Sequence, residues 1–377
     1  MSALRLAIIA GEHSGDQLGF KLMRALQVTT GGNVEFFGVG GEKMQAEGLT
    51  SFFPMSEIAV MGILPVLARL PSLLARIRES AKKIVEAKPD GLVIIDSPDF
   101  THRVARKVRK ALPGLPVVDY VSPSVWAWRP GRAKKMRAYV DCVLALLPFE
   151  PEAHQRLGGP RCVYVGHPLI ERLDELRGGA RETKRLVVLP GSRRSEIRRL
   201  SADFGAAIGL VAEKLGPLEV VLPTLPHIAD EVRALTATWP VAPRIVLGEA
   251  EKYAAFRSSQ AALAASGTVT LELALAGTPL VGAYKVSLFE EQLRFLIKVP
   301  SILLPNLVLG EPAIPELLQR DCNAEKLAAA LAPLLELSPS RARQVEALAR
   351  LDALMHLPSG RPPSEAAAQA VLETVRG

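Results

Sequence analysis

The hydrophobic positions of this 377-residue chain fall in short continuous runs, separated by segments with helical spacing. In the first half these runs lie at 4–10, 34–39, 91–96, 116–121, 141–147 and 161–165. In the second half they lie at 185–190, 218–222, 243–247, 261–265 and 279–284. Such runs are typical of strands buried on both faces, and their alternation with helices indicates parallel sheets with crossover helices. The pattern predicts an α/β fold, with helices alone beyond residue 322.

The chain is too long for one ordinary domain, so we expect two. The first series of strands ends at Gly-His-Pro (166–168), and a stretch rich in Arg and Gly precedes the second. We therefore place one Rossmann-like domain at 1–169 and another at 170–340. Residues 341–377 are expected to form C-terminal helices, with packing against the first domain as one option.

Composition narrows the class of partner. The formal net charge is +7, which favours phosphorylated substrates, an acidic membrane surface or nucleic acid. Aromatic residues make up 5% of the chain, and no helix-turn-helix, zinc-finger or RNA-stacking pattern occurs, so we expect no nucleic-acid partner. The three cysteines are widely spaced, which argues against disulfides and for a reducing compartment such as the cytoplasm. No run of 18 uncharged apolar residues is present, so we expect no membrane-spanning segment.

Two strand–turn–helix patterns in the second half carry polar turns. The first, at 185–197, has a Gly-Ser-Arg turn that includes Ser192 and Arg193. The second, at 261–276, has an Ala-Ser-Gly-Thr turn with Ser266, Gly267 and Thr268, and Glu272 follows one helical turn later. Backbone N–H groups at a helix start bind anions, and a guanidinium grips a phosphate with two hydrogen bonds. Each turn alone could be an ordinary helix cap, but the pair predicts a diphosphate with a ribose attached.

The turn after the first strand is acidic. It contains Glu12, Ser14 and Asp16 and lacks the Gly-x-Gly-x-x-Gly pattern of dinucleotide sites. Carboxylates repel a pyrophosphate but accept hydrogen bonds from sugar hydroxyls. We expect these residues on the side of a neutral, hydroxyl-rich ligand, unless Ser14 or Asp16 merely caps the following helix.

A second acidic turn, Asp-Ser-Pro-Asp, follows the strand at 91–96. Asp96 ends that strand directly, where a general base for an alcohol is expected. Asp99 precedes a helical pattern, where a capping carboxylate is the ordinary explanation. Asp96 is the first candidate for the base, and Asp99 stays open as the alternative.

These motifs together resemble the lipid-A-disaccharide synthase family, whose members are glycosyltransferases of the two-domain GT-B type. The resemblance runs in order from about residue 6 to residue 320 and includes Ala-Gly-Glu-His-Ser-Gly-Asp (10–16), Met-Gln-Ala-Glu-Gly (44–48), Val-Met-Gly (60–62), Ile-Asp-Ser-Pro-Asp-Phe (95–100), Tyr-Val-Ser-Pro-Ser-Val-Trp-Ala-Trp-Arg (120–129), Leu-Pro-Phe-Glu (147–150), Val-Gly-His-Pro (165–168), Leu-Pro-Gly-Ser-Arg (189–193), Ala-Ser-Gly-Thr (265–268) and Leu-Pro-Asn (304–306). The most specific of these is Pro-Ser-Val-Trp-Ala-Trp.

The resemblance implies a reaction. Members join UDP-2,3-diacylglucosamine to 2,3-diacylglucosamine 1-phosphate, form a β-1,6-linked disaccharide with inversion at the anomeric carbon, and release UDP. It implies Asp96 as the base, and Asn306 beside the nucleotide. No Asp-x-Asp motif stands near the nucleotide turns, so we expect no catalytic metal and no cofactor. A homodimer is compatible with the sequence.

Some positions differ from the usual sequence pattern of the family that this chain resembles. Thr101 stands where Asn usually follows Asp-Phe, Pro65 replaces a usual Glu, and Leu-Gly-Glu at 309–311 replaces Ala-Gly-Arg. The last change reverses a charge, so Glu311 is not carried over as a site residue.

Residues 58–85 combine an apolar segment with a basic one. Residues 58–68 are almost all apolar, and they are followed by the basic residues Arg69, Arg76, Arg78, Lys82 and Lys83. This pattern suits a helix at an anionic membrane surface, although an ordinary crossover helix would share it. Since the implied substrates carry acyl chains, we expect peripheral docking on the inner face of the bacterial inner membrane.

Other functions share this architecture. The alternatives are a UDP-N-acetylglucosamine transferase with another lipid acceptor, a UDP-sugar 2-epimerase, and a nucleotide-binding module without catalysis, which would need no Asp96.

Overall fold

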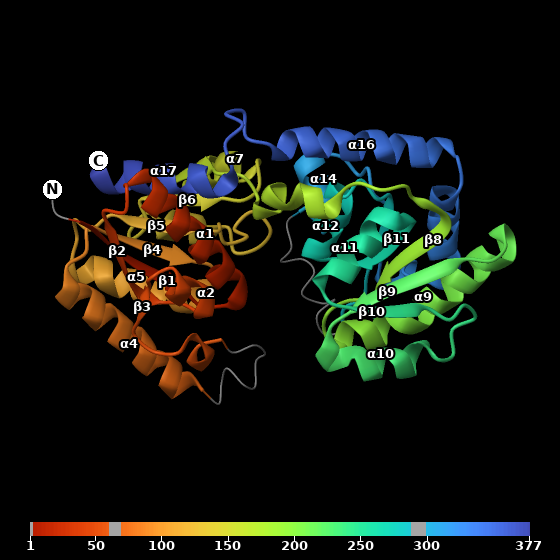
Figure 1. Ribbon diagram of the computed structural model, residues 1–377, viewed down its shortest axis with the longest axis horizontal. Coiled ribbons are helices and arrows are strands. Elements are labelled where there is room, and N and C mark those ends of the chain that lie inside the picture. Colours follow the sequence, from red (N-terminus) through yellow and green to blue (C-terminus); the bar gives the residue numbers. More distant parts are fainter. Residues whose placement is uncertain (1–2, 60–68, 288–298) are drawn as a thin grey trace. The chain divides into compact units, whose positions relative to one another are not determined.

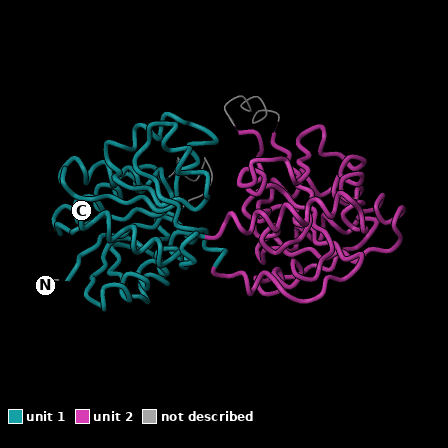
Figure 2. The backbone as a smooth tube through the Cα atoms, turned by 90° about the horizontal axis from the view of Figure 1, so that it is seen from above, with its two compact units in different colours: residues 1–170, 357–377 teal, residues 171–356 magenta. Residues whose placement is uncertain are grey.

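The computed structural model describes residues 3–59, 69–287 and 299–377 of the chain. The chain forms two compact units, residues 1–170 with 357–377 and residues 171–356 (Figure 2). Each unit is built on one parallel sheet with helices on both faces (Figure 1).

The sheet of the first unit has the strand order β3-β2-β1-β4-β5-β6-β7. These strands are β1 (Leu4–Ala10), β2 (Val34–Val39), β3 (Thr50–Ser51), β4 (Gly91–Ile95), β5 (Val117–Tyr120), β6 (Cys142–Ala145) and β7 (Arg161–Tyr164). Ala10 pairs with Ile95 and Ile95 with Tyr120, so β1, β4 and β5 end side by side. The turns that follow these three strands therefore lie along one edge of the sheet.

Helices cover both faces of this sheet. The helical segments are α1 (His13–Thr29), α2 (Glu42–Ala46), η1 (Met55–Glu57), α4 (Leu70–Ala87), α5 (Pro98–Ala111), α6 (Gly131–Met136), α7 (Glu150–Arg156) and α17 (Pro363–Arg376). One core lies between the sheet and α1 with α17, and the other between the sheet and α4, α5 and α6. Although α17 is the last helix of the chain, it packs beside α1, the first.

The sheet of the second unit has the order β10-β9-β8-β11-β12-β13. Its strands are β8 (Glu182–Leu189), β9 (Glu219–Thr224), β10 (Arg244–Leu247), β11 (Ser259–Ala265), β12 (Leu280–Tyr284) and β13 (Glu316–Leu318). Ala264 pairs with Leu189, so the turns after β8 and β11 are neighbours. The two polar turns predicted to bind a diphosphate are thus brought to the same edge.

The helical segments around this sheet begin with η2 at the unit boundary. They are η2 (Pro168–Arg172), α8 (Leu173–Leu176), α9 (Arg194–Leu215), η3 (Pro226–Ile228), α10 (Ala229–Thr236), α11 (Glu249–Ser258), α12 (Thr268–Leu275), α14 (Leu304–Leu309), η5 (Gln319–Asp321), α15 (Ala324–Leu331), η6 (Ala332–Leu335) and α16 (Pro339–Met355). The large core of the unit lies between the sheet and α9, α10 and α15. Of the C-terminal helices expected from residue 341 onward, α16 belongs to the second unit and α17 to the first.

The strands expected from the sequence are present, and the α/β class with parallel sheets is confirmed. Two strands were missed, β3 and β13, which are sheet-edge strands of two and three residues. Such short segments leave no readable alternation in the sequence. Among the described residues, no helix combines the length and apolar character needed to cross a membrane.

Candidate functional site

In the first unit, the turns after β1 and β4 are joined by side-chain hydrogen bonds. Ser14 Oγ donates to Asp96 Oδ2 across 3.2 Å, and Ser97 Oγ donates to Glu12 Oε1 across 2.9 Å. Gly11 permits this approach, because a Cβ at its position would lie 2.5 Å from Ser97 Cβ. Glu12 and Ser14, predicted from one turn, and Asp96, predicted from another, thus form one polar cluster.

The backbone turns sharply at Asp96. Asp96 and Ser97 have φ values of 54° and 45°, a left-handed conformation that Asp tolerates better than most residues. Asp96 Oδ1 accepts a hydrogen bond from the N–H of Ser97 at 2.7 Å, and the residue is half-buried. Each carboxylate oxygen carries two lone pairs, so both can still accept a further hydrogen bond.

Asp99 has different surroundings. Helix α5 begins at Pro98 with Ser97 as its N-cap, so Asp99 lies inside the first turn and is not the capping residue expected from the sequence. Its side chain is 88% exposed and lies 3.8 Å from the guanidinium of Arg132. No burial or network holds this carboxylate in one orientation.

Asp16 is 2% exposed, and its carboxylate binds backbone. It accepts hydrogen bonds from the N–H groups of Gly41, Lys43 and Met44 at 2.8, 3.2 and 3.1 Å. These groups stand at the start of α2. Asp16 therefore caps α2 from α1, a helix other than the one that the sequence indicated.

Beneath the same edge lies a buried polar cluster around Glu150. This carboxylate accepts hydrogen bonds from Trp126 Nε1 at 3.0 Å and from the N–H groups of Leu146 and Leu147 at 3.1 and 3.0 Å. Burial raises the pKa of Glu150 to about 7, although these donors favour the ionised form. The cluster anchors Trp126, and with it the loop that carries the most specific motif of the chain.

In the second unit, a cavity of about 490 Å³ opens at the carboxyl edge of the sheet. It is lined by Leu189, 191–193, Glu196, 223–226, 248–249, Lys252, 265–269 and Glu272. Six residues predicted for the nucleotide lie in this lining, namely Ser192, Arg193, Ser266, Gly267, Thr268 and Glu272. The pocket therefore unites both predicted turns.

The two turns differ in what their N–H groups already bind. Those of Ser192 and Arg193 donate to Glu196 Oε2 at 3.2 and 3.3 Å, and Arg193 also pairs with Glu196 Oε1 at 2.8 Å. The carboxylate of Glu196 thus occupies the turn that the sequence predicted to be free for binding an anion. At the other turn, Thr268 and Val269 lie in the first turn of α12, where a helix has no internal partner for its N–H groups.

Asn306 does not line the pocket. Its Nδ2 donates to the carbonyl of Ile314 at 2.9 Å and to Glu316 Oε1 at 3.2 Å, and its Oδ1 accepts from the N–H of Ile314 at 2.9 Å. The buried amide of Asn306 thus holds the loop between α14 and β13. Glu311, in the same loop, is ion-paired with Arg350 of α16.

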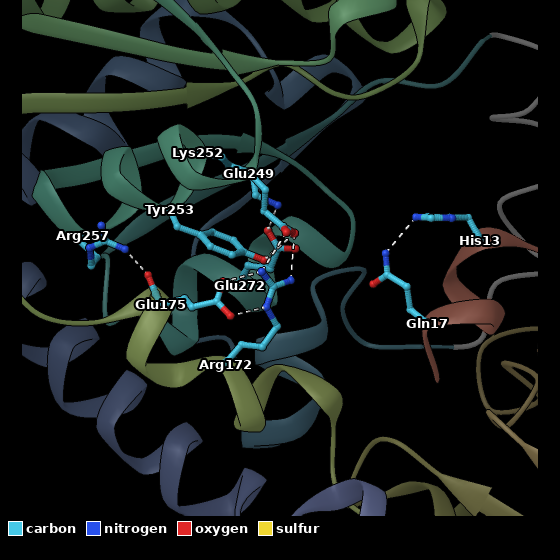
Figure 3. A network of polar contacts seen from close by, with 9 residues as sticks. All are labelled: His13, Gln17, Arg172, Glu175, Glu249, Lys252, Tyr253, Arg257 and Glu272. Atoms are coloured by element: carbon cyan, nitrogen blue, oxygen red, sulfur yellow. Dashed lines mark hydrogen bonds and ion pairs between the residues drawn. The ribbon is translucent and has the colours of Figure 1, made fainter. Parts of the chain in front are cut away.

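The sequence analysis did not predict that residues at the carboxyl ends of β9 and β10 contribute to this pocket. Figure 3 shows Lys252 of α11 pointing to Glu272 of α12, with Nζ 2.9 Å from Oε2. Glu249, also of α11, accepts hydrogen bonds from Arg172 and from the hydroxyl of Tyr253. The sequence did carry a signal for this contribution. Residues 223–226 and 248–249 directly follow predicted strands, so they lie at the same edge of the sheet as the two predicted turns.

The segment predicted to meet the membrane is described in part, since residues 60–68, including Pro65, lie outside the described residues. In α4, Ile77 and Ile84 face the core. Arg76 contacts Glu57, Glu79 and the ring of Phe53, so it serves the fold and not the surface. Its basic neighbours Arg69, Arg78 and Lys82 are exposed.

Across the described residues, no group of three or more His, Cys, Asp or Glu side chains is placed to hold a metal ion.

Comparison with known proteins agrees with these motifs. The family model described as lipid-A-disaccharide synthetase matches residues 6–370. A lipid-A-disaccharide synthase of Bradyrhizobium diazoefficiens is 56% identical over 99% of this chain and 97% of that protein.

The similar solved structures are distant in sequence, so they show the fold of this chain and nothing more. A UDP-glucosyltransferase of Polygonum tinctorium has a TM-score of 0.61 at 13% identity and covers 100% of this chain and 99% of its own. A UDP-GlcNAc 2-epimerase of Neisseria meningitidis, bound to UDP-GlcNAc, has a TM-score of 0.57 at 10% identity and full coverage of both chains. The expected GT-B fold is confirmed, and a transferase and an epimerase share it. The match along nearly the whole chain decides the family: this protein belongs to the lipid-A-disaccharide synthetases.

Proposed function

We propose that this chain joins UDP-2,3-diacylglucosamine to 2,3-diacylglucosamine 1-phosphate, forming a β-1,6-linked disaccharide 1-phosphate and UDP. The observation that carries the proposal is the membership of the family over residues 6–370. The two polar clusters supply the chemical groups that a transfer to an alcohol requires.

Asp96 is the proposed general base. It takes the proton of the acceptor's 6-hydroxyl, whose oxygen forms a bond to the anomeric carbon as the bond from that carbon to the diphosphate breaks. Attack from the face opposite the leaving group inverts the anomeric centre. Ser14 and the N–H of Ser97 orient the carboxylate, while Glu12 supports the loop through Ser97.

The pocket of the second unit is proposed to hold UDP. The first turn of α12 and the guanidinium of Arg193 face the diphosphate, whose negative charge grows as it departs. Glu272 accepts hydrogen bonds from the ribose hydroxyls. Ser192 and the N–H of Arg193 bind the diphosphate only if it displaces the carboxylate of Glu196 from them.

The acyl chains of both substrates lead to a further part of the proposal. The protein docks peripherally on the anionic inner face of the bacterial inner membrane, using residues 60–74 and the exposed basic residues of α4. The warrant is the apolar segment beside Arg69, Arg78 and Lys82.

The test is incubation with the acylated UDP-sugar, with and without the sugar 1-phosphate, followed by separation of the products. We expect disaccharide and UDP in equal amounts, and no consumption of donor without acceptor. Conversion of the donor to an epimer without acceptor would make the chain an epimerase, and transfer only to another lipid would change the acceptor.

A further inference from the structure

One cation in the nucleotide pocket has no role in the function proposed above. Lys252 extends from α11, and its Nζ lies 2.9 Å from Oε2 of Glu272 on α12. Both side chains are largely buried, with 25% of Lys252 and 14% of Glu272 exposed. Ion pairs with this degree of burial are coupled more strongly than surface pairs.

Lys252 is held in place by the aromatic side chains of its own helix. Nζ lies 4.6 Å from the ring centre of Tyr253 and 5.8 Å from that of Phe256, within the range of cation–π attraction. Tyr253 is fixed in turn, since its hydroxyl donates to Glu249 Oε1 at 3.1 Å and Arg172 lies over its ring (Figure 3). These contacts favour the position of Lys252 beside Glu272.

The charges that line the pocket show why such a cation is needed. Its carboxylates are Glu196, Glu249 and Glu272, and its cations are Arg193 and Lys252. Arg193 pairs with Glu196, and Arg172, outside the lining, pairs with Glu249. Without Lys252, the carboxylate of Glu272 would share a cavity of about 490 Å³ with a diphosphate and would repel it.

We propose that Lys252 is a positioning residue for donor recognition, which aims Glu272 at the ribose hydroxyls and neutralises it toward the diphosphate. A carboxylate discriminates ribose from 2′-deoxyribose only if it is held in one place. Lys252 thereby sets the selectivity of the pocket for a ribonucleoside diphosphate. This inference rests on the proposed function, because it takes UDP as the ligand.

The experiment measures binding of UDP, dUDP and uridine by calorimetry to the wild type, Lys252→Met, Glu272→Gln and the double variant. Lys252→Met should weaken UDP binding about tenfold, and uridine binding less, because uridine loses the aimed contact of Glu272 with the ribose but carries no diphosphate for Glu272 to repel. The preference for UDP over dUDP should fall toward one. Lys252→Arg, which keeps the charge, should restore part of the affinity.

The double variant separates a positioning role from a direct one. If Lys252 acts through Glu272, then Lys252→Met/Glu272→Gln binds UDP as Glu272→Gln does, and more tightly than Lys252→Met alone. If the double variant binds more weakly than Glu272→Gln, Lys252 contacts the diphosphate itself and the inference is wrong. Lys326→Met is the matched control, since it breaks an exposed pair with Asp321 outside the pocket.

Two further outcomes have distinct meanings. A wild-type protein that binds no UDP overturns the proposed function, and this inference with it. A wild type that binds UDP, beside a folded Lys252→Met with unchanged UDP affinity and unchanged selectivity, overturns this inference alone. Thermal unfolding of each variant shows whether it is folded.

Discussion

Ser14 donates its hydroxyl hydrogen to Asp96 Oδ2, so the first turn of α1 orients the carboxylate that ends β4. These residues are 82 positions apart in the chain, and the pairing of β1 with β4 brings them together. The contrast with the exposed Asp99 leads to the first prediction.

Asp96→Asn should lower turnover by a factor on the order of 10²–10⁴, because the amide cannot take the proton of the acceptor hydroxyl. UDP binding should survive, since Asp96 does not line the nucleotide pocket. Asp99→Asn is the matched control and should retain activity near that of the wild type. A large loss in Asp99→Asn with normal turnover in Asp96→Asn would transfer the role of base to Asp99.

The second prediction concerns Arg193. Arg193→Ala should weaken UDP binding by about 1–2 kcal/mol, roughly five- to thirty-fold in Kd. We expect no more than this because the side chain is 70% exposed and solvent screens its charge. Calorimetric titration with UDP measures the effect. Arg194→Ala, which removes the neighbouring arginine that pairs with Glu231, should bind UDP normally, and equal losses in both variants would contradict a specific role for Arg193.

The fold and the two turns of the pocket followed from the sequence because both depend on local patterns. A buried strand and a Gly-Ser-Arg or Ser-Gly-Thr turn are each visible within a few residues. The pair of Lys252 and Glu272 was not visible, because α11 and α12 belong to successive crossovers and only their packing joins the two side chains. Likewise, no local signal shows that Asp16 caps α2, or that the amide of Asn306 is used by the loop at Ile314.

The third prediction concerns pH and Glu150. Its folded-state pKa of about 7 lies above the ordinary value of 4.5, so between these values the folded state binds more protons than the unfolded state. Stability should therefore fall as pH rises through this window, by about 3 kcal/mol at most. Glu150→Gln removes this titration, so the stability of the variant relative to the wild type should increase across the window.

Urea unfolding at several pH values measures this difference, and subtraction of the two curves removes the titration of groups outside the Glu150 cluster, such as His167, whose pKa is lowered by burial. Glu152→Gln, at an exposed position of the same helix, should run parallel to the wild type. Parallel curves for Glu150→Gln and the wild type would mean that the pKa of Glu150 is not raised on folding, because its three N–H donors offset the effect of burial.

The last prediction concerns the membrane. The protein should float with liposomes that contain anionic lipid, and binding should fall steeply with salt, because each exposed basic residue near the surface contributes about 1 kcal/mol. Ile63→Ser/Leu64→Ser/Leu67→Ser should abolish flotation, since it removes the apolar segment and leaves the charges of α4 in place. Val28→Ser/Leu210→Ser/Leu337→Ser is the matched control, because it removes three exposed apolar side chains elsewhere. If both triple variants float as the wild type does, charge alone binds the membrane and residues 60–74 have another role. If the wild type fails to float even at low salt, the acylated substrates reach the enzyme by another route.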